Sequence, residues 1–131
     1  MKQFSVLVGL CFILLSCGEN RNVQVGNKTT MEVEPVYDAG NVLKGEVITA
    51  KFTLKNSGDY PLWVSEVKGS CSCTVAEYPQ EPIQPGESGE VLAHVDTQKT
   101  AAGLLNKGVR IVANTDPSIT QVVVKANVTV K

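Results

Sequence analysis

The chain has 131 residues, of which 43% are hydrophobic and 19% are charged. This composition is typical of one globular domain and argues against a disordered or multiply membrane-spanning chain. The 12 Lys and Arg residues nearly balance the 13 Asp and Glu residues, which leaves a formal net charge of −1 and no basic run. A nucleic-acid-binding surface is therefore not expected. A single histidine leaves little material for acid–base catalysis, so we do not expect an enzyme.

Residues 1–16 have the features of a signal peptide. Lys2 precedes an apolar run that is too short to cross a bilayer, since a spanning helix needs about 20 residues. The segment Leu14-Leu15-Ser16-Cys17 resembles the bacterial lipobox, in which the chain is cut before a cysteine that is then acylated. By that resemblance Cys17 is the lipid anchor of the mature protein. Several acyl chains together hold a protein stably on a membrane. The alternative is a plain secretory signal followed by a free Cys17.

Residues 17–30 are expected to form the lipidated N-terminus and a flexible tether. Gly18 to Thr30 is polar and has little apolar content, as in chain segments that do not fold by themselves. An aspartate directly after the lipidated cysteine resembles an inner-membrane retention signal, but this chain has Gly18 at that position. We therefore expect the protein in the bacterial cell envelope, anchored in the outer membrane.

From Met31 onward, short runs rich in Val, Ile and Thr are separated by Gly, Pro, Asn and Asp. Such spacing is typical of an all-β sandwich or barrel. The pattern predicts strands at residues 31–37, 47–55, 62–67, 91–97, 107–113 and 119–130, turns at 38–41, 44–46, 56–59 and 114–117, and a long surface connection at 78–89. Pro35 indicates an edge position or a kink in the first strand. About seven strands in roughly 100 residues indicate an immunoglobulin-like β-sandwich over residues 31–131.

Several short motifs resemble a known bacterial family. They are Asn56-x-Gly58-x-x-Pro61-Leu62, Cys71-Ser72-Cys73-Thr74, Ile83-x-Pro85-Gly86-Glu87 and Lys107-x-Val109-x-Ile111-x-x-Asn114. Together they resemble the domain-of-unknown-function family numbered 1573, small immunoglobulin-like modules common in exported lipoproteins of Bacteroidetes. These modules are similar in layout to the repeats of major sperm protein and of ciliary and centrosomal proteins. The resemblance implies the fold and export, and it brings no established activity.

Cys71 and Cys73 are the residues most suited to chemistry. In an extended strand their Cα atoms would lie about 6.6 Å apart, at the upper edge of the disulfide range, so a bond requires a bend in the chain. Three interpretations stay open: a structural pair, a redox site in an oxidising compartment, or a Cu(I) site with His94 as a candidate third ligand. Two cysteines are too few for a closed zinc site. The family usually has glycine where this chain has Ser72, which reduces the freedom for a tight turn there.

These observations favour a non-enzymatic, lipid-anchored immunoglobulin-like module without a cofactor. Its expected partners are the membrane, through the lipid on Cys17, and another envelope protein or a ligand. The alternative is an envelope thiol protein that is redox-active or binds copper through Cys71 and Cys73.

Overall fold

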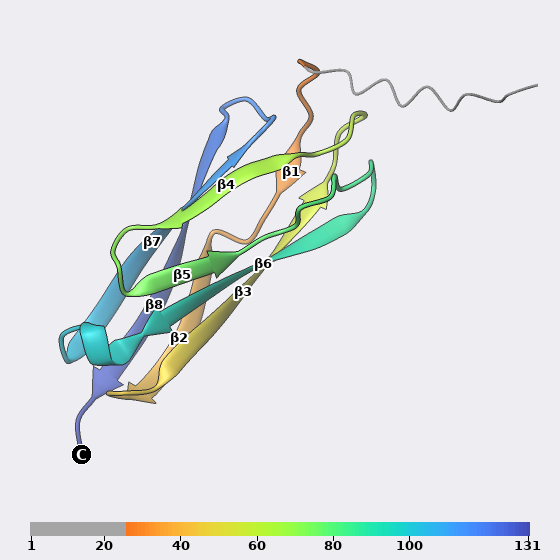
Figure 1. Ribbon diagram of the computed structural model, residues 1–131. Helices are drawn as coiled ribbons and strands as arrows, with labels where there is room; N and C mark the ends of the chain where they lie inside the picture. Colours follow the sequence, from red (N-terminus) through yellow and green to blue (C-terminus); the bar gives the residue numbers. More distant parts are fainter. Residues whose placement is uncertain (1–25) are drawn as a thin grey trace, which may run out of the picture.

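The computed structural model describes residues 26–131, which form two packed β-sheets of four strands each (Figure 1). One sheet has the order β1 (Met31–Glu32), β3 (Val47–Asn56), β6 (Ser88–Asp96) and β5 (Thr74–Glu77). The other has the order β2 (Val36–Leu43), β8 (Ile119–Thr129), β7 (Gly103–Ala113) and β4 (Val64–Gly69). All neighbouring strands are antiparallel except β2 and β8, which are parallel. The predicted immunoglobulin-like β-sandwich is confirmed.

The predicted signal peptide over residues 1–16 and the predicted lipid anchor Cys17 lie outside the described residues. Within residues 26–131, no helix has the length and apolar character needed to cross a membrane.

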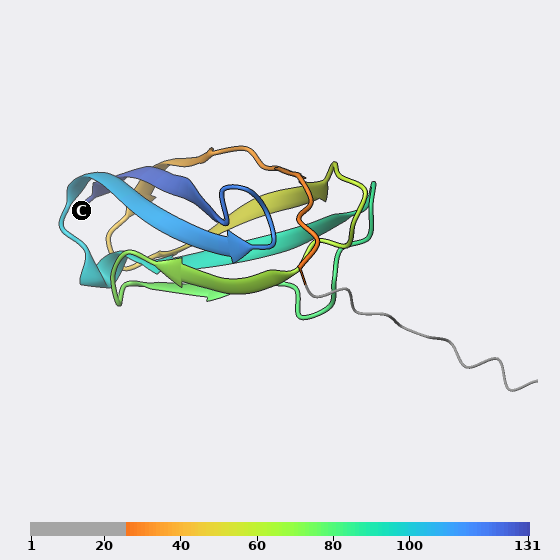
Figure 2. The same ribbon diagram turned by 90° about the horizontal axis from the view of Figure 1, so that it is seen from above.

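Alternating apolar residues on the strands build the core between the two layers, which Figure 2 shows from above. Every second residue of β3 is buried, as its alternation predicts. The core contains Leu62 and Ile83, which pair with each other outside the named strands. The rest of it is formed by the inward side chains of both sheets: Ile48, Ala50, Phe52, Leu54, Val64, Val67, Val91, Ala93, Val95, Leu105, Val109, Ile111, Ala113, Val122, Val124, Ala126 and Val128. Burial of this apolar surface is the main driving force for folding.

The first predicted strand is split between the two sheets. β1 ends at Glu32 and β2 begins at Val36, so the chain changes sheet at the predicted kink around Pro35. The predicted turn at residues 38–41 was wrong, because β2 continues through it with a shift of register. Asp38 Oδ1 accepts a hydrogen bond from Gly40 N (2.8 Å), and Gly40 has a φ of +67°. The turn-forming residues thus make an irregularity inside a strand.

Three other elements differ from the sequence pattern. Residues 74–77 form β5, which pairs with β6 and was not predicted as a separate strand. Residues 97–99 form a 3₁₀ turn, η1, because Asp96 accepts a hydrogen bond from Gln98 N and caps it. β7 begins at Gly103, four residues before the predicted strand.

The side chain of Asn56 is fully buried at the end of β3 and makes four hydrogen bonds. Its Oδ1 accepts from Thr29 Oγ1 (2.8 Å) and Gly58 N (3.1 Å). Its Nδ2 donates to the carbonyl oxygens of Tyr60 (2.7 Å) and Ile83 (2.9 Å). One carboxamide therefore links three segments that are distant in sequence.

Gly58 lets the chain pass close to this carboxamide. A Cβ atom at Gly58 would collide with Thr29 Oγ1 and Thr30 N. The spacing Asn56-x-Gly58 therefore combines a buried hydrogen-bonding side chain with a residue that leaves room for the N-terminal segment.

Asn114 plays the matching role at the end of β7. Its Nδ2 donates to the carbonyl oxygens of Asn27 (3.0 Å) and Pro61 (2.9 Å), and its Oδ1 accepts from Trp63 N (2.7 Å). Its own carbonyl oxygen accepts a hydrogen bond from Thr29 N (2.9 Å). The N-terminal segment is thus bound on both sides by the sandwich.

The last part of the expected tether belongs to the folded domain. Thr29 is buried, with 5% of its surface exposed, and Asn27 is already bonded to Asn114. The flexible tether was expected to run to Thr30, but the folded sandwich already includes Asn27.

The sandwich has two opposite ends (Figure 1). The near end comprises residues 27–30, 56–61 and 114–118, where the N-terminal segment joins the domain. The far end comprises residues 43–47, η1, residues 100–104 and Val130. There Lys44 N donates to Thr129 O and Thr97 N donates to Glu46 O. The N-terminal segment and the far end therefore lie on opposite sides of the domain.

We expect Asn56→Ala to lower the free energy of unfolding of residues 18–131 by about 3 kcal/mol, since it leaves buried donors and acceptors without partners. The measurement is equilibrium urea unfolding followed by far-UV circular dichroism.

The matched control is Ser57→Ala. Ser57 is exposed, and its Oγ donates a hydrogen bond to Thr30 Oγ1 (3.1 Å) at the surface of the domain. Its loss should change the free energy of unfolding by less than about 0.5 kcal/mol. Equal effects of the two substitutions would contradict the role given to Asn56.

Candidate functional site

The segment from Ser70 to Cys73 carries the chain from one sheet to the other. β4 ends at Gly69, and β5 begins at Thr74 on the opposite sheet. A Cβ atom at Gly69 would collide with the Thr74 side chain, so the two strand ends approach closely. Thr74 N donates to Cys71 O (3.2 Å), which closes a tight turn across the two cysteines.

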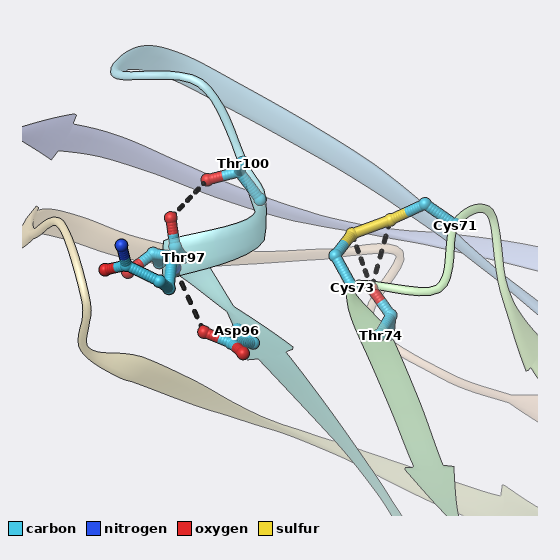
Figure 3. Close-up of a disulfide and its surroundings, with 7 residues drawn as sticks. Cys71, Cys73, Thr74, Asp96, Thr97 and Thr100 are labelled. Atoms are coloured by element: carbon cyan, nitrogen blue, oxygen red, sulfur yellow. Dashed lines mark hydrogen bonds between the residues drawn. A yellow bond between two sulfur atoms is a disulfide. The ribbon is translucent and has the colours of Figure 1, made fainter.

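Cys71 and Cys73 form a disulfide in this turn (Figure 3). Their Cα atoms are 5.2 Å apart, closer than the spacing of about 6.6 Å in a straight strand. The bend that such a bond requires is therefore supplied by the crossing between the sheets. Because the two sulfurs are bonded to each other, neither is a thiolate in this state.

The two cysteines have different surroundings. Cys73 is buried, with 5% of its surface exposed, whereas Cys71 is half-buried and lies between the exposed residues Ser70 and Ser72. Cys73 O accepts a hydrogen bond from Asp96 N (2.8 Å), which fixes Cys73 next to η1. The Cys71 side of the disulfide therefore faces solvent, and the Cys73 side faces the domain.

The hydroxyl group of Thr74 lies beside both sulfurs. Its Oγ1 is 3.7 Å from Cys73 Sγ and 3.9 Å from Cys71 Sγ. Thr74 is itself buried, so this hydroxyl is a polar group on the inner side of the disulfide. It can donate a hydrogen bond to a sulfur that gains negative charge.

His94 is not brought together with the cysteines. It lies on β6, where its Nδ1 is 3.1 Å from Thr49 Oγ1 and its Nε2 is 3.1 Å from Glu77 Oε1. These contacts form a polar row across three strands of one sheet. Within residues 26–131, no group of three or more His, Cys, Asp or Glu side chains is placed to hold a metal ion. A Cu(I) site at Cys71 and Cys73 would therefore have to form without His94 as placed here.

The far end exposes apolar side chains that the sequence pattern did not single out. They are Leu43 (39% exposed), Val47 (58%), Leu104 (87%) and Val130 (65%). Leu43 and Val130 line one shallow hollow together with Lys44 and Gln98, whereas Leu104 lines another with Asn41 and Asn127. Leu104 was missed because the predicted strand began at residue 107, and residues 104–106 were assigned to no element.

The fold and the cysteine turn define a small immunoglobulin-like β-sandwich module with a Cys-x-Cys disulfide. The model of the family described as "Protein of unknown function (DUF1573)" matches residues 22–128, and the chain belongs to this family. The resemblance in the motifs from Asn56 to Asn114 is thereby confirmed. No curated protein matches the chain.

Solved structures with the same architecture come from bacteria and from humans. A protein of unknown function from Porphyromonas gingivalis W83 is 22% identical with a TM-score of 0.69, over 83% of this chain and 51% of that one. The secreted serine protease VesC from Vibrio cholerae is 13% identical with a TM-score of 0.58, over 76% of this chain and 23% of that one. PapD-like domain 7 of human CEP192 is 11% identical with a TM-score of 0.57, over 79% of this chain and 88% of that one.

These likenesses establish the fold alone, because each identity is low. The chain spans about half the length of the Porphyromonas gingivalis structure.

Reduction of the disulfide should change stability only slightly. The bond closes a loop with a sequence separation of 2, and closing so short a loop removes little entropy from the unfolded chain. We expect the free energy of unfolding of residues 18–131 to fall by about 1.6 kcal/mol or less on reduction. The measurement compares urea unfolding with and without reductant. A fall of more than about 3 kcal/mol would show that the pair acts chiefly as a structural staple.

Proposed function

We propose that this chain is a lipid-anchored immunoglobulin-like module of the bacterial cell envelope that binds another envelope protein or a ligand through its far end. The lipobox-like residues Leu14 to Cys17 support the anchor. The family match and the sandwich support a folded module behind it.

The position of the near end supports an orientation relative to the membrane. Residues 18–25 separate the proposed anchor from the first described residue, and eight residues span at most about 29 Å when fully extended. With Asn27 and Thr29 bonded to the near end, that end would stay close to the bilayer. The far end would then face away from the membrane.

The observation that carries the binding proposal is the apolar surface of the far end. Leu104 is 87% exposed on β7, and Leu43, Val47 and Val130 are exposed near the same end of the sandwich. Leu43 and Val130 line one hollow there, and adjoining exposed apolar side chains mark sites of contact with other molecules. A partner at the far end would cover side chains that otherwise remain in water.

A second candidate function is that of an envelope thiol protein, and the disulfide between Cys71 and Cys73 favours it. Disulfides persist in the oxidising compartments outside the cytoplasm, and we expect this one to add little stability to the fold because the loop that it closes is short. In the reduced state the two thiolates would also be soft ligands of the kind that Cu(I) prefers.

The anchor is tested by Cys17→Ser. We expect the unaltered protein to sediment with the outer membrane and to carry the mass of its acyl chains, whereas Cys17→Ser lacks both properties because the acylated sulfur is gone. The measurements are density-gradient fractionation and intact mass. Cys11→Ser is the matched control and should behave as the unaltered protein. Acylation that survives in Cys17→Ser would contradict the anchor.

Binding through the far end is tested by a photo-crosslinking side chain at position 104, with position 53 as the control. Leu104 and Thr53 are both exposed strand residues, but Thr53 lies in the other sheet and close to Asn56 at the near end. We expect a discrete crosslinked product from position 104 in intact cells, and its loss when Val130→Asp is added. The same product at equal yield from position 53 would contradict the proposal.

A further inference from the structure

Because the two cysteines are unequally buried, an attacking thiolate reaches one sulfur of the disulfide more easily than the other. A thiolate attacks one sulfur of a disulfide, and the other sulfur leaves with the electron pair of the broken bond. Cys71 is half-buried between two exposed serines, whereas Cys73 is 5% exposed and fixed through Asp96 N. An incoming thiolate therefore reaches Cys71 from solvent and cannot reach Cys73 without moving the turn.

The surroundings of Cys73 suit a leaving sulfur. Thr74 Oγ1 lies 3.7 Å from Cys73 Sγ and can donate a hydrogen bond as negative charge develops on that sulfur. A buried anion without a donor is costly, so this hydroxyl lowers the barrier to leaving. The carboxylate of Asp96 accepts a hydrogen bond from Gln98 N (3.0 Å) at the start of η1, which occupies one of its oxygens.

We propose that Cys71–Cys73 exchanges its disulfide with the dithiol of a partner protein, with Cys71 as the attacked sulfur, Cys73 as the leaving sulfur and Thr74 as a positioning residue that donates to it. This inference rests on the thiol function given above as the second candidate. Its substrate class is a reduced protein outside the cytoplasm that carries two cysteines within reach of each other.

The reaction has two steps. First, a partner thiolate attacks Cys71 Sγ, the Cys71–Cys73 bond breaks, and a mixed disulfide forms while Cys73 Sγ takes the electron pair. Second, the other partner thiolate attacks the partner's own sulfur in the mixed disulfide, and Cys71 Sγ leaves as a thiolate. The partner dithiol loses two electrons and two protons in total, and Cys71 and Cys73 gain them. One chain oxidises one dithiol.

The first experiment measures which sulfur reacts. It uses the full-length chain with Cys11→Ser and Cys17→Ser, purified in detergent, so that only Cys71 and Cys73 remain. Cys73→Ser and Cys71→Ser then each leave a single thiol, whose reaction with an aromatic disulfide reagent is followed by absorbance. We expect the Cys71 thiol to react at least tenfold faster than the Cys73 thiol. Equal rates, or a faster Cys73, overturn the assignment.

The second experiment mixes the oxidised chain with reduced, unfolded ribonuclease A as the dithiol protein. We expect one ribonuclease disulfide for each Cys71–Cys73 bond lost. In samples quenched early with acid, which protonates the thiolates and stops exchange, we expect a mixed disulfide that peptide mass mapping places at Cys71. Thr74→Val should slow the exchange about tenfold, and Thr74→Ser should restore it. Circular dichroism of both Thr74 variants checks that they are folded.

The outcomes separate this inference from the function on which it rests. If ribonuclease is oxidised but the mixed disulfide forms through Cys73, the thiol function stands and the assignment of Cys71 fails. If the oxidised chain keeps its disulfide in excess reduced ribonuclease, both fail. If Thr74→Val exchanges as fast as the unaltered chain, the role of Thr74 fails.

Discussion

The carboxamide of Asn56 has no access to water and contacts the N-terminal segment, the loop after β3 and the connection after β5 at the same time. The four hydrogen bonds satisfy both the oxygen and the nitrogen of this buried carboxamide at the end of the sandwich. Such bonds contribute little each when they form, but a broken one leaves a buried polar group unsatisfied. The near end is therefore held as a unit, and Asn114 extends the same arrangement to the second sheet.

The two ends of the molecule therefore differ in their contacts. The near end is held by hydrogen bonds within the domain, whereas the far end exposes apolar side chains to solvent. At the near end, side-chain hydrogen bonds fix loops and the incoming chain. At the far end, η1 and the turn after β2 leave Leu43, Leu104 and Val130 in contact with solvent. The cysteine turn adjoins the far end, because Cys73 is bonded to the residue that caps η1. Both proposed functions thus use surfaces that the fold itself does not need to bury.

The strands with one polar face could be predicted from the sequence, whereas the contacts that join distant segments could not. The alternation of β3 is visible because its outer face is Thr and Lys from Thr49 to Lys55 and its inner face is apolar from Ile48 to Leu54. β2 was predicted only in part, because Asp38 and Gly40 are residue types typical of turns. Their place in a strand depends on the pairing of β2 with β8, which is distant in sequence. The spacing of Asn56, Gly58 and Asn114 was visible, but its cause lies in partners up to 87 residues away.

The same limit applies to the candidate site. The sequence identified Cys71 and Cys73 but left disulfide, thiol and metal site open, because the bend between them comes from the crossing of the chain between the sheets. His94 was a candidate ligand since nothing in its spacing shows that it faces Thr49 and Glu77. Unequal burial of the two cysteines likewise depends on the position of η1, which no local pattern predicted.

Native-state hydrogen exchange on residues 18–131 tests the central claim, that the side chains of Asn56 and Asn114 hold the near end together with the core. The amides to follow are those of Thr29 and Leu62, which donate to Asn114 O and Ile83 O, with the core amide of Phe52 as the reference. The account predicts that all three exchange only through global unfolding and give the same free energy. Exchange of Thr29 and Leu62 at a much lower free energy than Phe52 would contradict it.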